Sequence, residues 1–527
     1  MSLSGNVSAL AARVAEEFNA VRSEIGSLPL GGLGGVLDCS GMATASEINT
    51  ATSTAPAGAT VWLGARPSGS ELLVDETLII RPNMAFIGAG GRERLTRLLV
   101  DEEFPAGDPV VAAEGYLENR TLCDAPVVVR GIDIDCGGSA GSDGLVVYNF
   151  WSLFDDIQVR SCTGNGTLSD TAAIRIANRG VDGQTVTTNS HSENVFRQIR
   201  INGSANGATG IVQESYSSGA APEGNGGQAN QDGHILGLWI ANDGAVGGGR
   251  GLEFARAAGW TMRDVHMYGI GDDGARLMAC YATDLDGWYI ENYGNNDTAS
   301  DNYAGLQMEL LQGRGCTLSN VKITSGQEDS PAAANLRNFQ IRPGSGQNNV
   351  LVTLVGCHSG LNKTAAPSVP RTQAWRFGES GDTGRSMTVR MSGCATDPAS
   401  WFASPARYVH SSTVKVYDDN AQFVRTQSSS STTTISPTLE GDVVKVTASG
   451  NISALNVDTA GARDGQLLNV AVVAGGSSRT MGLHSSVRVL DGLDTSFTIP
   501  SGQIWRGAFR YWSDLSAWVL EAAGVTT

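Results

Sequence analysis

A six-residue pattern recurs along the middle of this 527-residue chain: apolar, two others, apolar, one other, apolar. It occurs eight times, at Val129/Ile132/Ile134, Phe154/Ile157/Val159, Phe196/Ile199/Ile201, Ile235/Leu238/Ile240, Met262/Val265/Met267, Leu285/Trp288/Ile290, Leu318/Val321/Ile323 and Leu336/Phe339/Ile341. The alternation that ends each unit is that of a β-strand, so the last two apolar side chains point to one side.

The position just before each final apolar pair is a candidate bend. It is occupied by Gly131, Asp156, Gln198, Gly237, Asp264, Gly287, Asn320 and Asn338. Most of these residue types tolerate or favour left-handed backbone. Each unit is therefore predicted to be a strand end, a tight bend and a short strand.

The spacing of the units indicates the kind of repeat. The middle apolar residue recurs after 18 to 42 positions, whereas leucine-rich, ankyrin and propeller arrays keep nearly constant periods. A second strand pair precedes several units, at Leu145/Val147, Ile174/Ile176, Leu252/Phe254 and Leu306/Met308. We therefore predict an all-β fold, a right-handed parallel β-helix whose coils carry loops of variable length.

Charge and hydropathy narrow the classes of partner. The chain has 36 Lys and Arg against 53 Asp and Glu, a net charge of −17. Such a surface repels nucleic acid and anionic membranes, so neither is an expected partner. We see no basic stretch followed by an apolar core at the N-terminus and no apolar run of about 20 residues, so we expect neither a signal peptide nor membrane insertion.

The eight cysteines are scattered, without a Cys-x-x-Cys pair. This pattern predicts neither a zinc site nor a disulfide framework, and we expect the thiols to be buried as small apolar groups. Asp133-Ile134-Asp135 is not followed by a calcium-binding loop. No metal and no cofactor are expected.

Residues 1–29 form a separate segment with apolar residues at heptad-like spacing, Leu3, Val7, Leu10, Val14, Phe18, Val21, Ile25 and Leu28. A lone helix of this length is marginal in water, so its apolar seam must pack on something. The alternatives are two more copies of itself in a homotrimer, a larger assembly, or the chain's own body. A Gly-rich joint follows at 30–42.

The rest of the chain divides into a β-helix, a linker and a terminal domain. We assign 43–425 to a capped β-helix with a neck and 426–434, rich in Ser and Thr, to a linker. Short alternating segments separated by turn residues follow in 435–527 and predict a β-sandwich.

The opening of the β-helix carries a resemblance to a known family. A capping helix near Ala45, then AGATVWLGARPSG at 57–69 and ETLIIRPNMAFIGAGG at 76–91, resembles the first coils of pectate-lyase-like β-helices in bacteriophage tailspikes and tail fibres. The C-terminal RGAFRYWSDLSAWVL resembles the terminal sandwich of phage fibre proteins. The resemblance implies a homotrimer in the virion tail, attached to tail or baseplate proteins through residues 1–29 and bound to a host surface glycan.

The residue between the two final apolar positions must point outward. Along the coils it is Asp133, Gln158, Arg200, Trp239, His266, Tyr289, Lys322 and Gln340. Trp239, His266 and Tyr289 are thus expected to form an outer aromatic strip, about 4.8 Å per step, that can stack on sugar rings. The alternatives are a contact between subunits, since interfaces are rich in aromatic residues, and incidental exposure.

Cleavage of a glycan would require two carboxylates flanking one bond. Glu253 projects outward between Leu252 and Phe254, and Glu291 follows Ile290 beside the aromatic strip. We take Glu253 and Glu291 as the candidate acid/base pair and Asp284 as the reserve, with plain surface charge as the alternative for each.

The leading interpretation is a phage tail adhesin that recognises a host surface polysaccharide during adsorption. Whether it also cleaves the polymer, as a glycoside hydrolase or lyase, stays open at this stage. The alternatives are a purely structural or binding fibre and a free polysaccharide lyase, the last disfavoured by the N-terminal seam.

Overall fold

The computed structural model describes residues 35–526, apart from internal segments at 67–68, 92–93, 168–169, 186–192, 215–231, 243–248, 295–301, 312, 326–334, 364–371, 379–384, 398–408, 411–413, 419–423, 430–431, 436–441, 460–461, 463 and 465. The predicted N-terminal helix at 1–29 lies outside the described residues.

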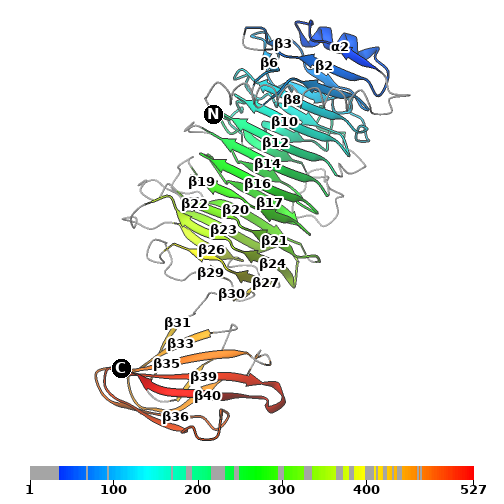
Figure 1. The fold of residues 1–527 in the computed structure, drawn as a ribbon. Helices are drawn as coiled ribbons and strands as arrows, with labels where there is room; N and C mark the ends of the chain where they lie inside the picture. Colours follow the sequence, from blue (N-terminus) through cyan, green and yellow to red (C-terminus); the bar gives the residue numbers. More distant parts are fainter. Residues whose placement is uncertain are drawn as a thin grey trace, which may run out of the picture.

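The repeated units stack in register into one long parallel sheet (Figure 1). This long sheet has 19 strands: β1 (Val36–Asp38), β2 (Thr60–Gly64), β3 (Leu72–Val74), β5 (Ala85–Gly88), β6 (Arg97–Val100), β8 (Val128–Asp135), β10 (Leu153–Arg160), β12 (Val195–Asn202), β14 (His234–Ala241), β16 (Thr261–Tyr268), β18 (Asp284–Asp286), β19 (Tyr289–Glu291), β21 (Cys316–Ser319), β22 (Lys322–Ser325), β24 (Val350–Val355), β25 (His358–Leu361), β27 (Met387–Ser392), β28 (Ala395–Thr396) and β30 (Val414–Asp418). Every pairing within it is parallel, as in β14 with β16.

The strand pairs predicted to precede the units form a second parallel sheet. This second sheet has 11 strands: β4 (Leu78–Ile80), β7 (Val111–Ala113), β9 (Leu145–Val147), β11 (Ala172–Ile176), β13 (Thr209–Gln213), β15 (Leu252–Phe254), β17 (Ala275–Cys280), β20 (Asn302–Leu310), β23 (Asn335–Pro343), β26 (Gln373–Phe377) and β29 (Val409–His410). Each coil contributes to both sheets in turn, which confirms the predicted parallel β-helix.

The predicted bends are present in the long sheet. Gly131, Asp156, Gln198, Gly237, Asp264, Gly287 and Asn320 all have positive φ, between 51° and 79°. Gly356 and Gly393 continue the series with φ of 61° and 62°. A left-handed residue redirects the chain within one position, so each rung of the long sheet is two short strand pieces joined at an elbow.

The eighth unit belongs to the second sheet, which differs from the prediction. Leu336, Phe339 and Ile341 lie on β23 of the second sheet, and the next rung of the long sheet is β24 with β25. Asn338 is therefore not a bend. It is buried, accepts a hydrogen bond from the Tyr293 hydroxyl (2.7 Å) and donates to the Gly360 carbonyl (2.7 Å).

The apolar side chains form one continuous interior file. Ile157, Ile199, Leu238, Val265, Trp288 and Val321 are each at most 2% exposed and belong to a single core cluster that extends from Cys39 to Val416. In-register pairing of neighbouring rungs places Ile199 beside Leu238 and Leu238 beside Val265.

A column of glycines brings the two sheets close together. Gly210, Gly251 and Gly274 stand just before or at the start of successive strands of the second sheet, and a Cβ atom at each would lie 2.4 Å from the carbonyl oxygen of the glycine one rung further on. The same Cβ on Gly274 would lie 2.7 Å from Ile290 of the long sheet. The interior at this edge has no room for a side chain.

The N-terminal end of the column is covered by α2 (Ala45–Ser53), as predicted. Thr44 and Glu47 form a capping box at its start, which satisfies backbone donors that would otherwise lack partners. Strand β1 already pairs with β2, so part of the predicted 30–42 joint belongs to the first rung. A second helix, α3 (Glu114–Leu117), packs outside the second sheet.

The C-terminal part of the chain has two sheets and a hydrophobic core of its own, which extends from Ile435 to Leu520. This agrees with the predicted β-sandwich. The larger sheet contains β31 (Val424–Ser429), β33 (Asp442–Ala448), β35 (Leu467–Ala474), β37 (Arg488–Val489), β39 (Ile504–Trp512) and β40 (Ala517–Thr526). The smaller contains β32 (Thr432–Ile435), β34 (Ile452–Val457), β36 (Arg479–Leu483) and β38 (Ser496–Ile499). A short 3-10 helix, η2 (Ser513–Leu515), connects β39 to β40.

The segment predicted as a linker at 426–434 contributes to strands instead. Parts of it lie in β31 and β32, which pair with β33 and β34. The physical reason is that threonine is β-branched and fits a strand. Along β32, Thr433 is buried while Thr432 and Thr434 are exposed, which is the alternation of a strand with one face on a core.

All eight cysteines are buried, as expected, and the structure has them as free thiols. Cys136 and Cys162 stand on adjacent rungs with their sulfur atoms 3.0 Å apart.

Candidate functional site

The outward side chains of the long sheet form one column along its rungs. In-register pairing joins Arg200 to Trp239, Trp239 to His266 and His266 to Tyr289. Lys322 and His358 continue the column. Gln340 was expected in this column but lies on the second sheet, because its unit belongs to β23. Trp239, His266 and Tyr289 therefore lie side by side on three adjacent rungs.

The rings of the strip pack partly on one another. The imidazole of His266 stacks on Tyr289 with centroids 5.0 Å apart and an angle of 21° between the planes. The ammonium of Lys322 lies 4.9 Å from the centroid of Tyr289. His266 and Lys322 are on the rungs either side of Tyr289, so the faces of this ring are occupied by neighbours. This differs from the expectation of open ring faces at all three positions.

Glu291 holds the His266 and Tyr289 side chains in place. One carboxylate oxygen lies 3.1 Å from Nε2 of His266, and the other accepts a 2.7 Å hydrogen bond from the Tyr289 hydroxyl. Burial, and then the hydrogen bond to Glu291, raise the pKa of Tyr289. The phenol therefore stays protonated and serves as a donor.

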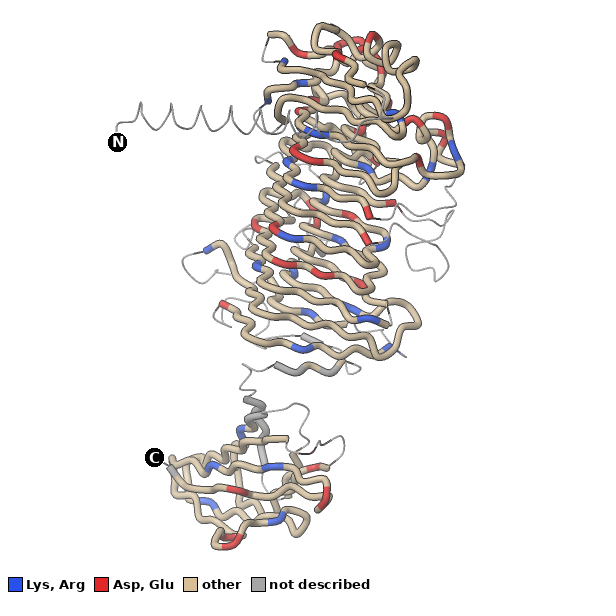
Figure 2. Tube along the Cα trace, turned by 45° about the vertical axis from the view of Figure 1, so that its right-hand side comes forward, with Lys and Arg blue, Asp and Glu red and all other residues tan. Residues whose placement is uncertain are grey.

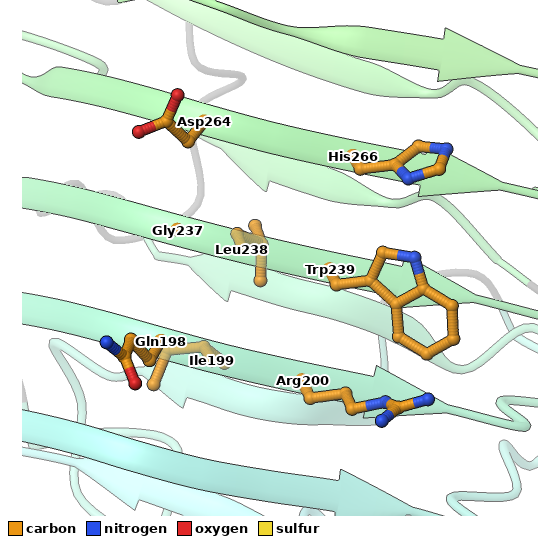
Figure 3. A pocket seen from close by; sticks show the side chains of 8 residues that line it. All are labelled: Gln198, Ile199, Arg200, Gly237, Leu238, Trp239, Asp264 and His266. Atoms are coloured by element: carbon orange, nitrogen blue, oxygen red, sulfur yellow. The ribbon is translucent and has the colours of Figure 1, made fainter. Parts of the chain in front are cut away.

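A groove of about 460 Å³ opens beside Trp239 on the outer face of the long sheet (Figure 3). It is lined by Gln198, Ile199, Arg200, Gly237, Leu238, Trp239, Asp264 and His266. Three of these, Gln198, Gly237 and Asp264, are the elbow residues of consecutive rungs. Gly237 has no side chain, so a gap remains between Gln198 and Asp264. We call this the elbow groove.

The elbow groove combines one large aromatic ring with several polar groups. The Arg200 guanidinium lies 4.1 Å from the centroid of the Trp239 ring system. The carboxylate of Asp264, the amide of Gln198 and the imidazole of His266 complete the polar lining. An apolar ring surrounded by a few donors and acceptors is suited to a ligand with apolar faces and many hydroxyl groups.

The proposed acid/base pair is not brought together. Glu253 lies on β15 of the second sheet, between the buried residues Leu252 and Phe254, and pairs with Arg250 (2.8 Å) and Arg276 (3.7 Å). Glu291 lies on β19 of the long sheet. Both carboxylates point away from the core that separates the two sheets, so they cannot flank one glycosidic bond.

The reserve carboxylate, Asp284, is exposed at the start of β18. It is on the same sheet as Glu291, but the elbow at Gly287 lies between them.

Two further carboxylates, missed in the sequence, lie next to Glu253. Asp272 and Asp273 are buried and both contact Arg250. Burial, followed by the charge of Asp273, raises the pKa of Asp272 to about 6. Burial also raises the pKa of Asp273, against the opposing effect of Arg250.

The role of Asp273 follows from a second copy of the same corner. Asp143 precedes Gly144, accepts from the backbone N–H of Ala172 (2.7 Å) and binds Arg175. Asp273 precedes Gly274, accepts from the backbone N–H of Ala304 (2.7 Å) and binds Arg250. Both aspartates thus clamp successive coils together. The repeated Asp-Gly before a second-sheet strand was the sequence signal for this corner.

Among the residues that the structure describes, no group of three His, Cys, Asp or Glu side chains is arranged to hold a metal ion. No helix in the described part of the chain is long and apolar enough to cross a membrane.

Among known proteins, this chain is similar only to solved structures. No family model matches the chain, and no curated protein matches it. The Dettilon tailspike protein is similar over 90% of this chain and 78% of its own, with 12% identity and a TM-score of 0.43. A protein of a Geobacillus virus is similar over 89% of this chain and 71% of its own, with 9% identity and a TM-score of 0.28.

The catalytic domain of Agl-KA is similar over 70% of this chain and 64% of its own, with 10% identity and a TM-score of 0.34. A phage tailspike is thus among the solved structures that this chain resembles. Each of these three TM-scores is below 0.5.

Proposed function

We propose that this protein is a phage tail adhesin, a tailspike or tail fibre, that binds a host surface polysaccharide through the elbow groove. The observation that carries the proposal is the groove itself, in which Trp239 is surrounded by Arg200, Asp264, Gln198 and His266. Residues 1–29 attach it to the tail in this proposal, and three chains assemble around that segment.

The chemistry of the groove favours a sugar. The C–H groups on one face of a pyranose ring pack against an aromatic face, while its hydroxyl groups need hydrogen-bond partners at the ring edge. Trp239 supplies the aromatic surface, and Gln198 and Asp264 supply an amide and a carboxylate across the gap left by Gly237. A protein of net charge −17 is poorly suited to nucleic acid, but its charge does not oppose binding to neutral hydroxyl groups.

The position of the groove favours a polymer over a small ligand. The groove is open to solvent on the outer face of a stack of rungs, and the column of outward side chains continues beyond it to Lys322 and His358. In the other direction the column reaches Gln158, which is buried. Parallel rungs about 4.8 Å apart form a rigid surface on which an extended chain can contact several coils at once.

The groove favours binding without hydrolysis. Asp264 is the one carboxylate among its described lining residues, whereas glycoside hydrolysis normally uses two. Adhesion is therefore the function we propose, and a reducing-end assay tests it against cleavage.

The test is equilibrium binding of the full-length protein to surface polysaccharides purified from a panel of bacteria, with new reducing ends measured in parallel. For a polysaccharide that binds, we expect Trp239→Ala to weaken affinity by at least about tenfold, or about 1.4 kcal/mol. The matched control is Trp512→Ala, which removes an exposed Trp (45%) of the C-terminal domain. Unchanged affinity in Trp239→Ala would contradict the groove as the site.

The alternative that the strip is a contact between subunits gives a different result. Sedimentation of Trp239→Ala and Tyr289→Ala would then show dissociation of the oligomer. The adhesin proposal expects both variants to sediment as the wild type does.

A further inference from the structure

The aromatic strip is bordered by two cations that lack a carboxylate partner. Arg200 lies on the rung before Trp239, and Lys322 lies on the rung after Tyr289. Each is held over a ring, at 4.1 Å and 4.9 Å from its centroid. Neither makes an ion pair with any residue that the structure describes. The Nε atom of Arg200 is buried and has no hydrogen-bond partner among the described residues.

Three arginines on the rungs near Arg200 are neutralised by aspartates. Arg130 and Arg197 both bind Asp155, at 3.2 Å and 2.6 Å. Arg160 binds Asp133 and Asp135 at 3.2 Å and 2.7 Å. Paired charges thus prevail on the neighbouring rungs. Figure 2 shows acidic and basic residues interspersed along the β-helix. Arg200, which has no such carboxylate partner among the described residues, keeps its charge available to a ligand in the groove.

We propose that Arg200 and Lys322, which stand four rungs apart, each recognise an anionic group on the glycan, a carboxylate or a phosphate. This inference rests on the proposed function and specifies its substrate class. A guanidinium has a planar set of donors that matches the oxygens of either anion, and a ring face behind it keeps its orientation fixed. Lys322 adds a second positive charge at the far end of the strip.

The nearby carboxylates leave these two cations available. Glu291 is occupied by His266 and Tyr289. Asp264 lines the groove on the elbow side, two rungs from Arg200 along the stack. In a chain of net charge −17, long-range repulsion opposes an acidic polymer. Binding such a polymer therefore requires local cations that are not already neutralised.

The experiment starts from a polysaccharide that the full-length protein binds. One portion is carboxyl-reduced and another is dephosphorylated, so that each treatment removes one source of anionic charge. Affinity of the wild type, Arg200→Gln and Lys322→Gln is measured for all three polymers. Arg263→Gln, an exposed arginine on the same strand as His266, is the matched control for loss of one charge.

We expect one of the two treatments to weaken wild-type binding about tenfold or more, which corresponds to about 1.4 kcal/mol. Arg200→Gln should weaken binding to the untreated polymer to a similar extent and have little further effect on the treated one. Arg200→Lys should restore part of the loss, and Arg263→Gln should bind like the wild type. Circular dichroism confirms that each variant is folded.

The inference is overturned if both treated polymers bind as tightly as the native one, or if Arg200→Gln weakens binding to native and treated polymers equally. In either case the proposed adhesin function stands, because binding through Trp239 is retained. Failure of the protein to bind any surface polysaccharide overturns the proposed function and this inference with it.

Discussion

The glycine column makes the β-helix unusually sensitive to a single methyl group. Gly274 immediately precedes β17, whose neighbours in the second sheet are β15 and β20. Its φ is not in the left-handed region, so Gly274→Ala tests steric space without adding backbone strain. The added Cβ would lie 2.4 Å from the Gly305 carbonyl oxygen and 2.7 Å from Ile290. The carbonyl cannot retreat freely because Gly274 is itself hydrogen-bonded to the neighbouring coil, its N–H donating to Ala304 (2.9 Å).

Overpacking of this kind costs about 1–3 kcal/mol, and a backbone neighbour places Gly274→Ala near about 3 kcal/mol. The unfolding entropy is about 2.1 cal/mol/K per residue over the roughly 380 residues from Cys39 to Val416, so the expected loss in Tm is about 4 °C. Differential scanning calorimetry of the full chain measures it. Gly41→Ala, where a Cβ meets nothing within 4 Å, is the control and should leave Tm unchanged. Equal Tm values for the two variants would refute the close approach of the two sheets.

Two further substitutions test local energetics. Asp272 has a pKa raised to about 6, so the stability that its protonation contributes is present below about pH 4 and is lost as the pH rises through 6. We expect Asp272→Asn to raise the free energy of unfolding at pH 8 by up to about 3 kcal/mol, and to flatten its pH dependence between about pH 4 and 6. The exposed control Asp284→Asn should do neither. Trp151 is 61% exposed with φ of 51°, a conformation that costs a bulky residue about 1 kcal/mol, so Trp151→Asn should stabilise the fold by that amount in urea unfolding. Trp512 has an ordinary φ of −119°, and a gain of the same size in Trp512→Asn would show that backbone strain is not the cause.

The inward file and the elbows could be predicted from the sequence because both depend on local rules. Strand alternation fixes which side chains point inward, as at Leu238 and Val265. Residue type identifies positions that accept left-handed backbone, as at Gly237 and Asp264. Neither inference needs knowledge of distant parts of the chain.

The assignment of a strand to one of the two sheets could not be predicted in the same way. Leu336, Phe339 and Ile341 have the spacing of a long-sheet unit, but they lie on β23 of the second sheet. Asn338 looks like a bend residue in the sequence and is a buried hydrogen-bonding node in the structure. One pattern is compatible with both sheets, because both alternate inward and outward side chains.

The same ambiguity affected the candidate site. The three residues of the aromatic strip occupy the same position in successive repeats of one sheet. The sequence repeat alone therefore predicts that they lie side by side. The pairing of Glu253 with Glu291 required a correct sheet assignment for two strands, which the sequence does not supply. The elbow groove cannot be recognised in the sequence because Gln198, Gly237 and Asp264 are 39 and 27 positions apart, and each has only the local signature of a bend.

The most direct test is a crystal structure of the full-length protein with an oligosaccharide derived from the polysaccharide that it binds. We predict electron density for sugar rings beside Trp239, between Arg200 and His266, with an anionic substituent on the Arg200 guanidinium. Well-defined sugar density elsewhere on the molecule, with the elbow groove free of ligand, would contradict the proposal that this groove binds the host glycan.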